Sequence, residues 1–269
     1  MLNTTKSNCW LLLALLLAIP QLSQAQGSFE TLQEIRKRGE LRIASLREPL
    51  YPFSVLREGH WSGYEIDLAQ SVANTLGVKL VWDASYDNTA AMVAALKQRK
   101  ADLVFARVKR DLATAQQVNY SLPYLALNFV LVTNRLKVLE KKPVDDRFQS
   151  ISQLSLRIGT IDSSTYINKA SKRFPKAKVE TFSSIASLTQ ALESGKIDAV
   201  FCDEVEARNM FVDKPERGLH LGYFALPELR SEVAAIVDWP DTNFVSWLNL
   251  ALEPVAGKTR VDQLFLKHY

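Results

Sequence analysis

The sequence contains very little cysteine and histidine. Its 269 residues include only Cys9 and Cys202, together with His60, His220 and His268. Two cysteines allow at most one disulfide, and the histidines lack the short spacing that zinc ligands show. Neither a nucleophile elbow nor a zinc-protease helix motif is present. We therefore expect no metal site, no cofactor and no enzymatic activity.

Long hydrophobic runs are also missing. The most apolar stretch, residues 9–20, is far shorter than the roughly 20 residues that a membrane-spanning helix needs. It follows a short polar start and precedes Ser-Gln-Ala, which is the pattern of a signal peptide cleaved after Ala25. Removal of residues 1–25 would leave Cys202 as the single cysteine and exclude an internal disulfide. We expect a protein exported to the periplasm.

A strong charge of one sign is lacking as well. The chain has 33 Lys and Arg against 29 Asp and Glu, a formal net charge of +4. This balance is too even to predict a nucleic acid or a membrane surface as partner. The short basic clusters are typical of solvated surfaces.

The sequence does contain a unit that occurs twice. Residues 95–107 read ALKQRKADLVFAR, and residues 191–203 read ALESGKIDAVFCD. Each copy is typical of a helix end, a tight turn and a buried parallel strand. A second echo, Leu-Arg-Ile at 41–43 and again at 156–158, opens a strand-like run in each half. The pattern predicts two lobes, each built from βαβ units.

Strand-like and helix-like segments alternate in both halves. The expected strands cover residues 41–46, 79–84, 101–106, 156–161, 178–182 and 197–202. Residues 47–63 are expected to be irregular, and residues 136–150 to form a charged connector. The C-terminal tail is too small to fold alone, so we expect it to complete lobe 1. Lobe 1 would then comprise residues 26–127 and 232–269, lobe 2 residues 128–231, and the chain would cross twice between them.

The two copies of the repeat end in opposite charges, Arg107 and Asp203. Ligands of open parallel sheets bind outside the carboxyl ends of the strands, so facing lobes would place a cation opposite an anion across a cleft. Such a cleft suits a small ligand that carries both charges. A charge at the end of an apolar strand is costly unless exposed or paired, and a salt bridge of Arg107 to Asp111 or another carboxylate is the alternative. Lys109 and Arg110 fit either the cleft or a solvated turn.

Further candidates also have structural alternatives. Glu206 follows Asp203 by three residues, so Asp203 could cap a helix in a capping box, and both roles can hold together. Ser164 and Thr165 open a helix after a strand, where hydroxyls and free amides bind carboxylates. N-capping explains these two residues equally well. Cys202 lies inside a strand and is predicted to be a small core residue.

Four segments together resemble the family 3 periplasmic solute-binding proteins of polar amino-acid ABC transporters. They are GYEIDLA at 63–69, ALKQRKADLVF at 95–105, VNYSLPY at 118–124 and DAVFCDE at 198–204. The resemblance implies an α/β, two-lobed type II periplasmic binding protein fold. Each lobe would be a doubly wound, mostly parallel sheet, and a two-strand hinge would join them. It also implies a small-molecule ligand and an inner-membrane ABC permease as partners.

The resemblance implies roles for single residues. In the family an aromatic residue in the loop after the first strand covers the ligand, and Tyr51 and Phe53 stand there, although they could equally pack over the edge of the lobe. The aspartate that takes the ligand amino group matches Asp203. The arginine that grips the ligand carboxylate falls on Thr114, so this clamp is missing, and Arg107 lies seven residues earlier. The predicted ligand-binding residues are Tyr51, Phe53, Arg107, Lys109, Thr114, Ser164, Thr165 and Asp203.

We expect a receptor that captures a small amino acid or related charged metabolite for an ABC permease. A cyclohexadienyl dehydratase-like enzyme is the alternative, because such enzymes share the clamp. The general-acid glutamate that this second resemblance implies falls on Ile167, which cannot transfer a proton. A periplasmic sensor whose closed form docks on a signalling protein is a third reading.

Overall fold

The computed structural model describes residues 30–142, 148–161 and 164–267. The expected signal peptide, residues 1–25, lies outside these ranges. Within them, no helix combines the length and apolarity that a bilayer crossing requires.

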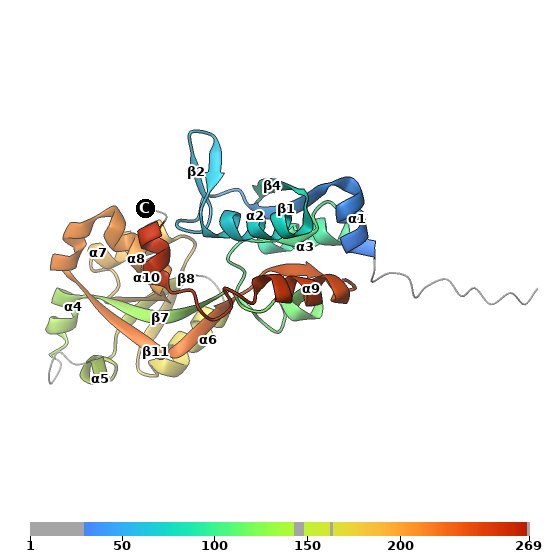
Figure 1. The fold of residues 1–269 in the computed structure, drawn as a ribbon. Helices are drawn as coiled ribbons and strands as arrows, with labels where there is room; N and C mark the ends of the chain where they lie inside the picture. Colours follow the sequence, from blue (N-terminus) through green and yellow to red (C-terminus); the bar gives the residue numbers. More distant parts are fainter. Residues whose placement is uncertain (1–29, 143–147, 162–163, 268–269) are drawn as a thin grey trace, which may run out of the picture.

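Lobe 1 is built on a five-stranded sheet with the strand order β4-β1-β5-β12-β6. Its strands are β1 (Glu40–Leu46), β4 (Lys79–Tyr86), β5 (Leu103–Val104), β6 (Val118–Tyr120) and β12 (Ile236–Asp238). The first three in the sheet are parallel, and β12 runs antiparallel between β5 and β6. The helices of this lobe are α1 (Glu30–Arg38), α2 (Tyr64–Leu76), α3 (Thr89–Lys97) and α9 (Thr242–Leu252), seen together in Figure 1.

Lobe 2 repeats this arrangement around a second sheet of order β11-β7-β10-β8-β9. Its strands are β7 (Leu125–Asn134), β8 (Arg157–Ile161), β9 (Lys178–Phe182), β10 (Ala199–Asp203) and β11 (Leu221–Val233). Here β8, β9 and β10 are parallel, whereas β7 and β11 are antiparallel to their neighbours. Its helices are α4 (Arg135–Glu140), α5 (Phe148–Ile151), α6 (Ser164–Arg173), α7 (Ile185–Glu193) and α8 (Glu204–Asp213).

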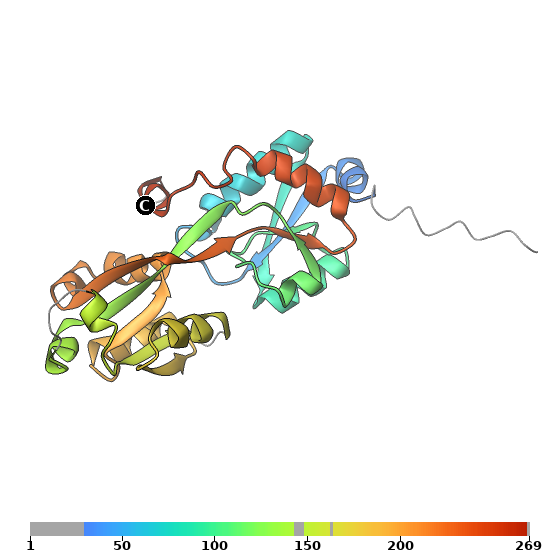
Figure 2. The same cartoon turned by 90° about the horizontal axis from the view of Figure 1, so that it is seen from below.

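The two lobes are joined by β7 and β11, which run side by side from one lobe to the other (Figure 2). Their ladder extends from Leu125 opposite Val233 to Asn134 opposite Leu221, with one register shift between Leu226 and Arg230. Two α/β lobes with this connection confirm the predicted fold class. The exact lobe boundaries along these strands remain a prediction.

The sequence repeat marks the same contact in both lobes. Asp102 accepts hydrogen bonds from the backbone N–H and the Nη2 of Arg42, both at 2.9 Å. Asp198 accepts the corresponding bonds from Arg157 at 2.8 and 2.6 Å. Each aspartate N–H donates back to the carbonyl oxygen of its arginine. The two repeated sequence segments therefore mark neighbouring parallel strands in each lobe, β1 beside β5 and β8 beside β10.

Two expected irregular segments contain regular structure. Residues 47–63 include a hairpin of β2 (Val55–Arg57) and β3 (His60–Ser62). Glu58 and Gly59 at its tip both have positive φ, 51° and 79°, which matches the twist of a tight hairpin. The expected connector 136–150 overlaps two helices, α4 and α5. The helix α4 begins where the Asn134 side chain accepts the Lys137 N–H and so caps it.

The interior of each lobe is apolar, as the alternation of strands and helices requires. Cys202 is completely buried within β10 and has a free thiol, which confirms the prediction of a core residue. The C-terminal helix α10 (Val261–Lys267) lies beside α8 in Figure 1, and its Phe265 ring packs edge-on against Tyr51 at 5.2 Å between centroids.

Candidate functional site

A cavity of about 380 Å³ lies where the two lobes face each other. Lobe 1 contributes the end of β1, the start of α3 and the segment after β5. Lobe 2 contributes the end of β8, the start of α6 and the first turn of α8. These are carboxyl ends of strands and the first turns of the helices, the position expected for a ligand site in parallel sheets.

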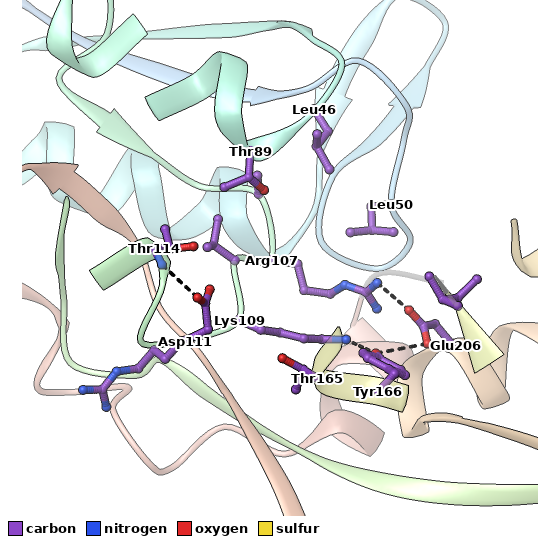
Figure 3. A pocket seen from close by; sticks show the side chains of 14 residues that line it. Leu46, Leu50, Thr89, Arg107, Lys109, Asp111, Thr114, Thr165, Tyr166 and Glu206 are labelled. Atoms are coloured by element: carbon purple, nitrogen blue, oxygen red, sulfur yellow. Dashed lines mark hydrogen bonds and ion pairs between the residues drawn. The ribbon is translucent and has the colours of Figure 1, made fainter. Parts of the chain in front are cut away.

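The opposite charges at the ends of the repeat meet directly in this cavity. Arg107 Nη2 lies 2.9 Å from Glu206 Oε1, and Nη1 lies 3.5 Å from Asp203 Oδ2. Lys109 Nζ lies 2.7 Å from the same Asp203 oxygen and also contacts the Tyr166 hydroxyl. Figure 3 shows Arg107 and Lys109 extending from lobe 1 toward Glu206 and Tyr166 of lobe 2. The cluster therefore ties the lobes together.

Asp203 combines the two roles that its sequence context suggested. It ends β10 and caps α8, where Oδ1 accepts the N–H groups of Val205 and Glu206, each at 3.0 Å. The Glu206 side chain accepts the Asp203 N–H in return, which completes a capping box. Oδ2 is left to face the cations of lobe 1 and accepts the Tyr166 hydroxyl at 2.9 Å.

Glu65 holds the backbone at Arg107 in an uncommon conformation. Arg107 has φ 48°, in the left-handed region, and its N–H donates to Glu65 Oε1 at 2.6 Å. The same oxygen accepts the Tyr124 hydroxyl, whereas Oε2 is buried without a partner. Burial raises the pKa of Glu65 to about 7, even though these hydrogen bonds act in the opposite direction.

The charges of the cluster stabilise one another. Burial would raise the pKa of Asp203, but the charges of Lys109 and Arg107 hold it well below its usual range. Burial likewise disfavours the charge of Arg107, yet Asp203 and Glu206 raise the pKa of its guanidinium above the ordinary value. Burial and the nearby Asp203 charge raise the pKa of Tyr166, so its hydroxyl remains a donor at neutral pH. The site is ionised but nearly balanced in charge.

Four predicted residues line the cavity: Arg107, Lys109, Thr114 and Thr165. Asp203 lies directly behind the cations, and its side chain is 0% exposed. The side chain of Ser164, the first residue of α6, lies outside the described part of the chain. Contact of each with a ligand remains a prediction.

The two predicted aromatics do not line the cavity. Phe53 is 0% exposed and belongs to the lobe 1 core, with its ring centroid 5.8 Å from the guanidinium carbon of Arg107. Tyr51 packs against Phe265, and its carbonyl oxygen accepts the Asn209 side chain of lobe 2 at 3.0 Å. Both aromatic residues therefore have packing roles in this structure, and contact of either with a ligand remains a prediction.

Three residues of the site were missed by sequence reasoning. Tyr166 adjoins Thr165, but nothing in the sequence distinguishes it from a core aromatic. Glu206 was considered only as a capping partner of Asp203. Glu65 lies in the GYEIDLA segment as the second residue of α2, where an acidic residue is ordinary, so its burial leaves no signal in the sequence.

Among the described residues, no group of three His, Cys, Asp or Glu side chains could hold a metal ion. Two α/β lobes joined by two strands, with a charged cavity between them, define a protein of the type II periplasmic binding class. The chain belongs to the bacterial extracellular solute-binding proteins, family 3, whose profile matches residues 41–175. The resemblance found in the sequence is thereby confirmed.

Individual relatives include binding proteins and an enzyme. The probable histidine-binding protein of Campylobacter jejuni is 23% identical over 168 residues, which cover 61% of this chain and 60% of that protein. ArtP, the arginine-binding extracellular protein of Bacillus subtilis, is 24% identical over 266 residues, 97% of each chain. The cyclohexadienyl dehydratase of Pseudomonas aeruginosa is 26% identical over 197 residues, which cover 71% of this chain and 69% of the enzyme.

A similar solved structure is the ancestral cationic amino acid solute-binding protein AncCDT-1. It has a TM-score of 0.67 and 25% identity, and the match covers 89% of this chain and 99% of AncCDT-1.

Proposed function

We propose that this protein is an exported receptor that captures a small charged metabolite of the amino-acid or organic-acid class and delivers it to an inner-membrane ABC permease. The observation that carries the proposal is the cavity between the lobes, where Arg107 and Lys109 of one lobe face Asp203 and Glu206 of the other. Relatives named as histidine-binding and arginine-binding proteins support it.

The geometry supports capture by closure. A solute that contacts groups of both lobes stabilises the form in which the lobes lie together, and this differential affinity drives the change. The β7 and β11 pair is the connection about which the lobes would move. Because the closed form presents both lobes in one fixed arrangement, a permease could distinguish it from the open form.

A dehydratase is the second candidate, since one relative is such an enzyme. The observation against it is the start of α6, where Ile167 occupies the position of the expected general acid. The carboxylates that line the cavity are engaged: Glu206 with Arg107, and Asp111 with the Thr114 N–H at 2.8 Å. Formation of phenylpyruvate from prephenate, followed by absorbance, would support the enzyme instead.

The test is a thermal-shift screen of residues 26–269 with amino acids and organic acids. A ligand at about 100 times its Kd adds about 2.7 kcal/mol of stability, which corresponds to roughly 5–10 °C in Tm for a chain of this size. Arg107→Met should abolish the shift. Arg260→Met, on an exposed residue outside the cavity that pairs with Asp262, should keep the shift. A panel in which no compound shifts the Tm would contradict the receptor function.

A further inference from the structure

Asp203, the carboxylate at the centre of the charge cluster, has its hydrogen-bonding capacity filled by the protein itself. Each carboxylate oxygen offers about two lone-pair sites. Asp203 Oδ1 uses both on the helix cap, and Oδ2 accepts the Lys109 ammonium at 2.7 Å and the Tyr166 hydroxyl at 2.9 Å. Its side chain is completely buried. A solute ammonium group therefore finds no free acceptor on Asp203.

Two carboxylates line the cavity itself, Glu206 and Asp111, and both are partly engaged. Glu206 Oε1 accepts Arg107 at 2.9 Å, and Oε2 accepts the Asp203 N–H at 3.4 Å. Glu206 Oε2 also lies 3.3 Å from the Tyr166 hydroxyl, whose single proton is directed mainly to Asp203. Asp111 accepts the Thr114 N–H at 2.8 Å and a longer bond from the Tyr120 hydroxyl at 3.4 Å. Figure 3 shows its carboxylate turned toward Thr114 and away from Glu206.

Donors, in contrast, remain available. Arg107 has more N–H groups than its two contacts use, and the Lys109 ammonium has donor capacity beyond Asp203 and Tyr166. The Thr89 and Thr165 hydroxyls line the cavity and have no hydrogen-bond partner among the described residues. The side chains of Lys109 and Arg107 are 20% and 12% exposed, against 0% and 10% for Asp203 and Glu206. The cations of the cluster therefore keep free donor groups, the two threonine hydroxyls can donate as well, and the Asp203 carboxylate has no free acceptor.

We propose that the cavity selects small carboxylic acids through their carboxylate oxygens and makes no use of an amino group. Lys109 occupies the acceptor that a solute ammonium would need, so it acts as a built-in substitute for that group. A basic amino acid is disfavoured because its second cation would meet Lys109 and Arg107, and Asp203 has no acceptor left for it. This inference rests on the proposed receptor function and names its substrate class.

The experiment is calorimetric titration with pairs of compounds that differ only in the amino group. Succinate is compared with aspartate and glutarate with glutamate, and arginine and histidine complete the panel. We expect the acid without the amino group to bind at least as tightly as its partner, and the basic amino acids at least tenfold more weakly. An amino acid that binds more than tenfold tighter than its deaminated partner overturns the inference and leaves the receptor function standing. If none of these compounds binds, both the carboxylic-acid selectivity and the receptor function are refuted.

A variant tests the role of Lys109 directly. Lys109→Met keeps an unbranched, flexible side chain of similar bulk but removes the ammonium from Asp203 Oδ2, so the ratio of aspartate to succinate affinity should rise at least tenfold. Lys178→Met is the matched control, because Lys178 lies on β9 with a 77% exposed side chain; it should leave the ratio unchanged. An unchanged ratio in folded Lys109→Met refutes the assignment. If that variant does not fold, the paired titrations of the unmodified protein still show whether the amino group of the solute contributes to its affinity.

Discussion

Glu65 should make the stability of this protein depend on pH near neutrality. Its carboxyl is completely buried, with Oε1 bonded to the Arg107 N–H and to Tyr124 and Oε2 without a partner. The perturbation is Glu65→Gln, which keeps the acceptor oxygen and removes the ionisable proton. The amide NH₂ replaces an oxygen that has no partner, which costs about 1–3 kcal/mol at every pH. The informative quantity is therefore the slope of stability with pH.

The magnitude follows from the pKa of Glu65, raised by burial from 4.5 to about 7. The folded protein then binds a proton more tightly than the unfolded chain. The free energy of unfolding consequently falls as pH rises from about 4.5 to 7 and is level above that. At about 1.4 kcal/mol per pKa unit the fall amounts to roughly 3 kcal/mol. Glutamine has no proton to lose, so the variant should lack this component.

The assay is urea unfolding at pH 5 and pH 8 for the unmodified protein and the variant. The free energy of unfolding at pH 5 minus that at pH 8 should be about 2.5 kcal/mol smaller in Glu65→Gln than in the unmodified protein. Asp67→Asn, on an exposed carboxylate of the same helix, should keep the difference of the unmodified protein. Equal pH dependence in Glu65→Gln and the unmodified protein would refute the reasoning, because the buried carboxyl would then ionise without a penalty.

Two further substitutions test local geometry. Gly63→Ala should lower the Tm by about 5 °C or more, since a Cβ there would lie 2.4 Å from the carbonyl oxygen of Phe53 at φ 126°. Gly77→Ala, also at positive φ but with open space, should lose clearly less, and equal losses would contradict a steric cause. Tyr166→Phe removes the hydroxyl that donates to Asp203 at 2.9 Å and should reduce the free energy of unfolding by about 1–2 kcal/mol in urea titrations. An unchanged urea midpoint would mean that this bond contributes nothing.

The repeat made the architecture and the central charge pair predictable. Arg107 and Asp203 follow equivalent strands, and equivalent strand ends in two facing lobes lie on opposite sides of one cleft. Whether their charges pair directly depends on the distance between the two lobes, and no local sequence pattern predicts that distance. Lys109 was predicted for the same segment, but its position on Asp203 requires the three-dimensional structure.

The missed features depend on contacts between distant segments. Residues 47–63 are rich in aromatics, but sequence composition does not say that Phe53 points into the core while Tyr51 meets the C-terminal helix. Glu65 and Tyr166 look like ordinary members of helix starts until the segments that they touch are in place. The hairpin was missed because Glu58 is an unusual residue at positive φ.

The strand β12 lies between β5 and β6 although it comes from the last part of the chain. The sheet of lobe 1 therefore lacks one interior strand until residues 236–238 are present, although its other four strands all lie between residues 40 and 120. Long-range pairing of this kind is slow to form. The lobe 2 sheet also ends late, with β11 at Val233, but only lobe 1 must pair β12 with strands that end more than 100 residues earlier, the later one at Tyr120. Closing the lobe 1 sheet therefore depends on the longest-range pairing between strands of the fold.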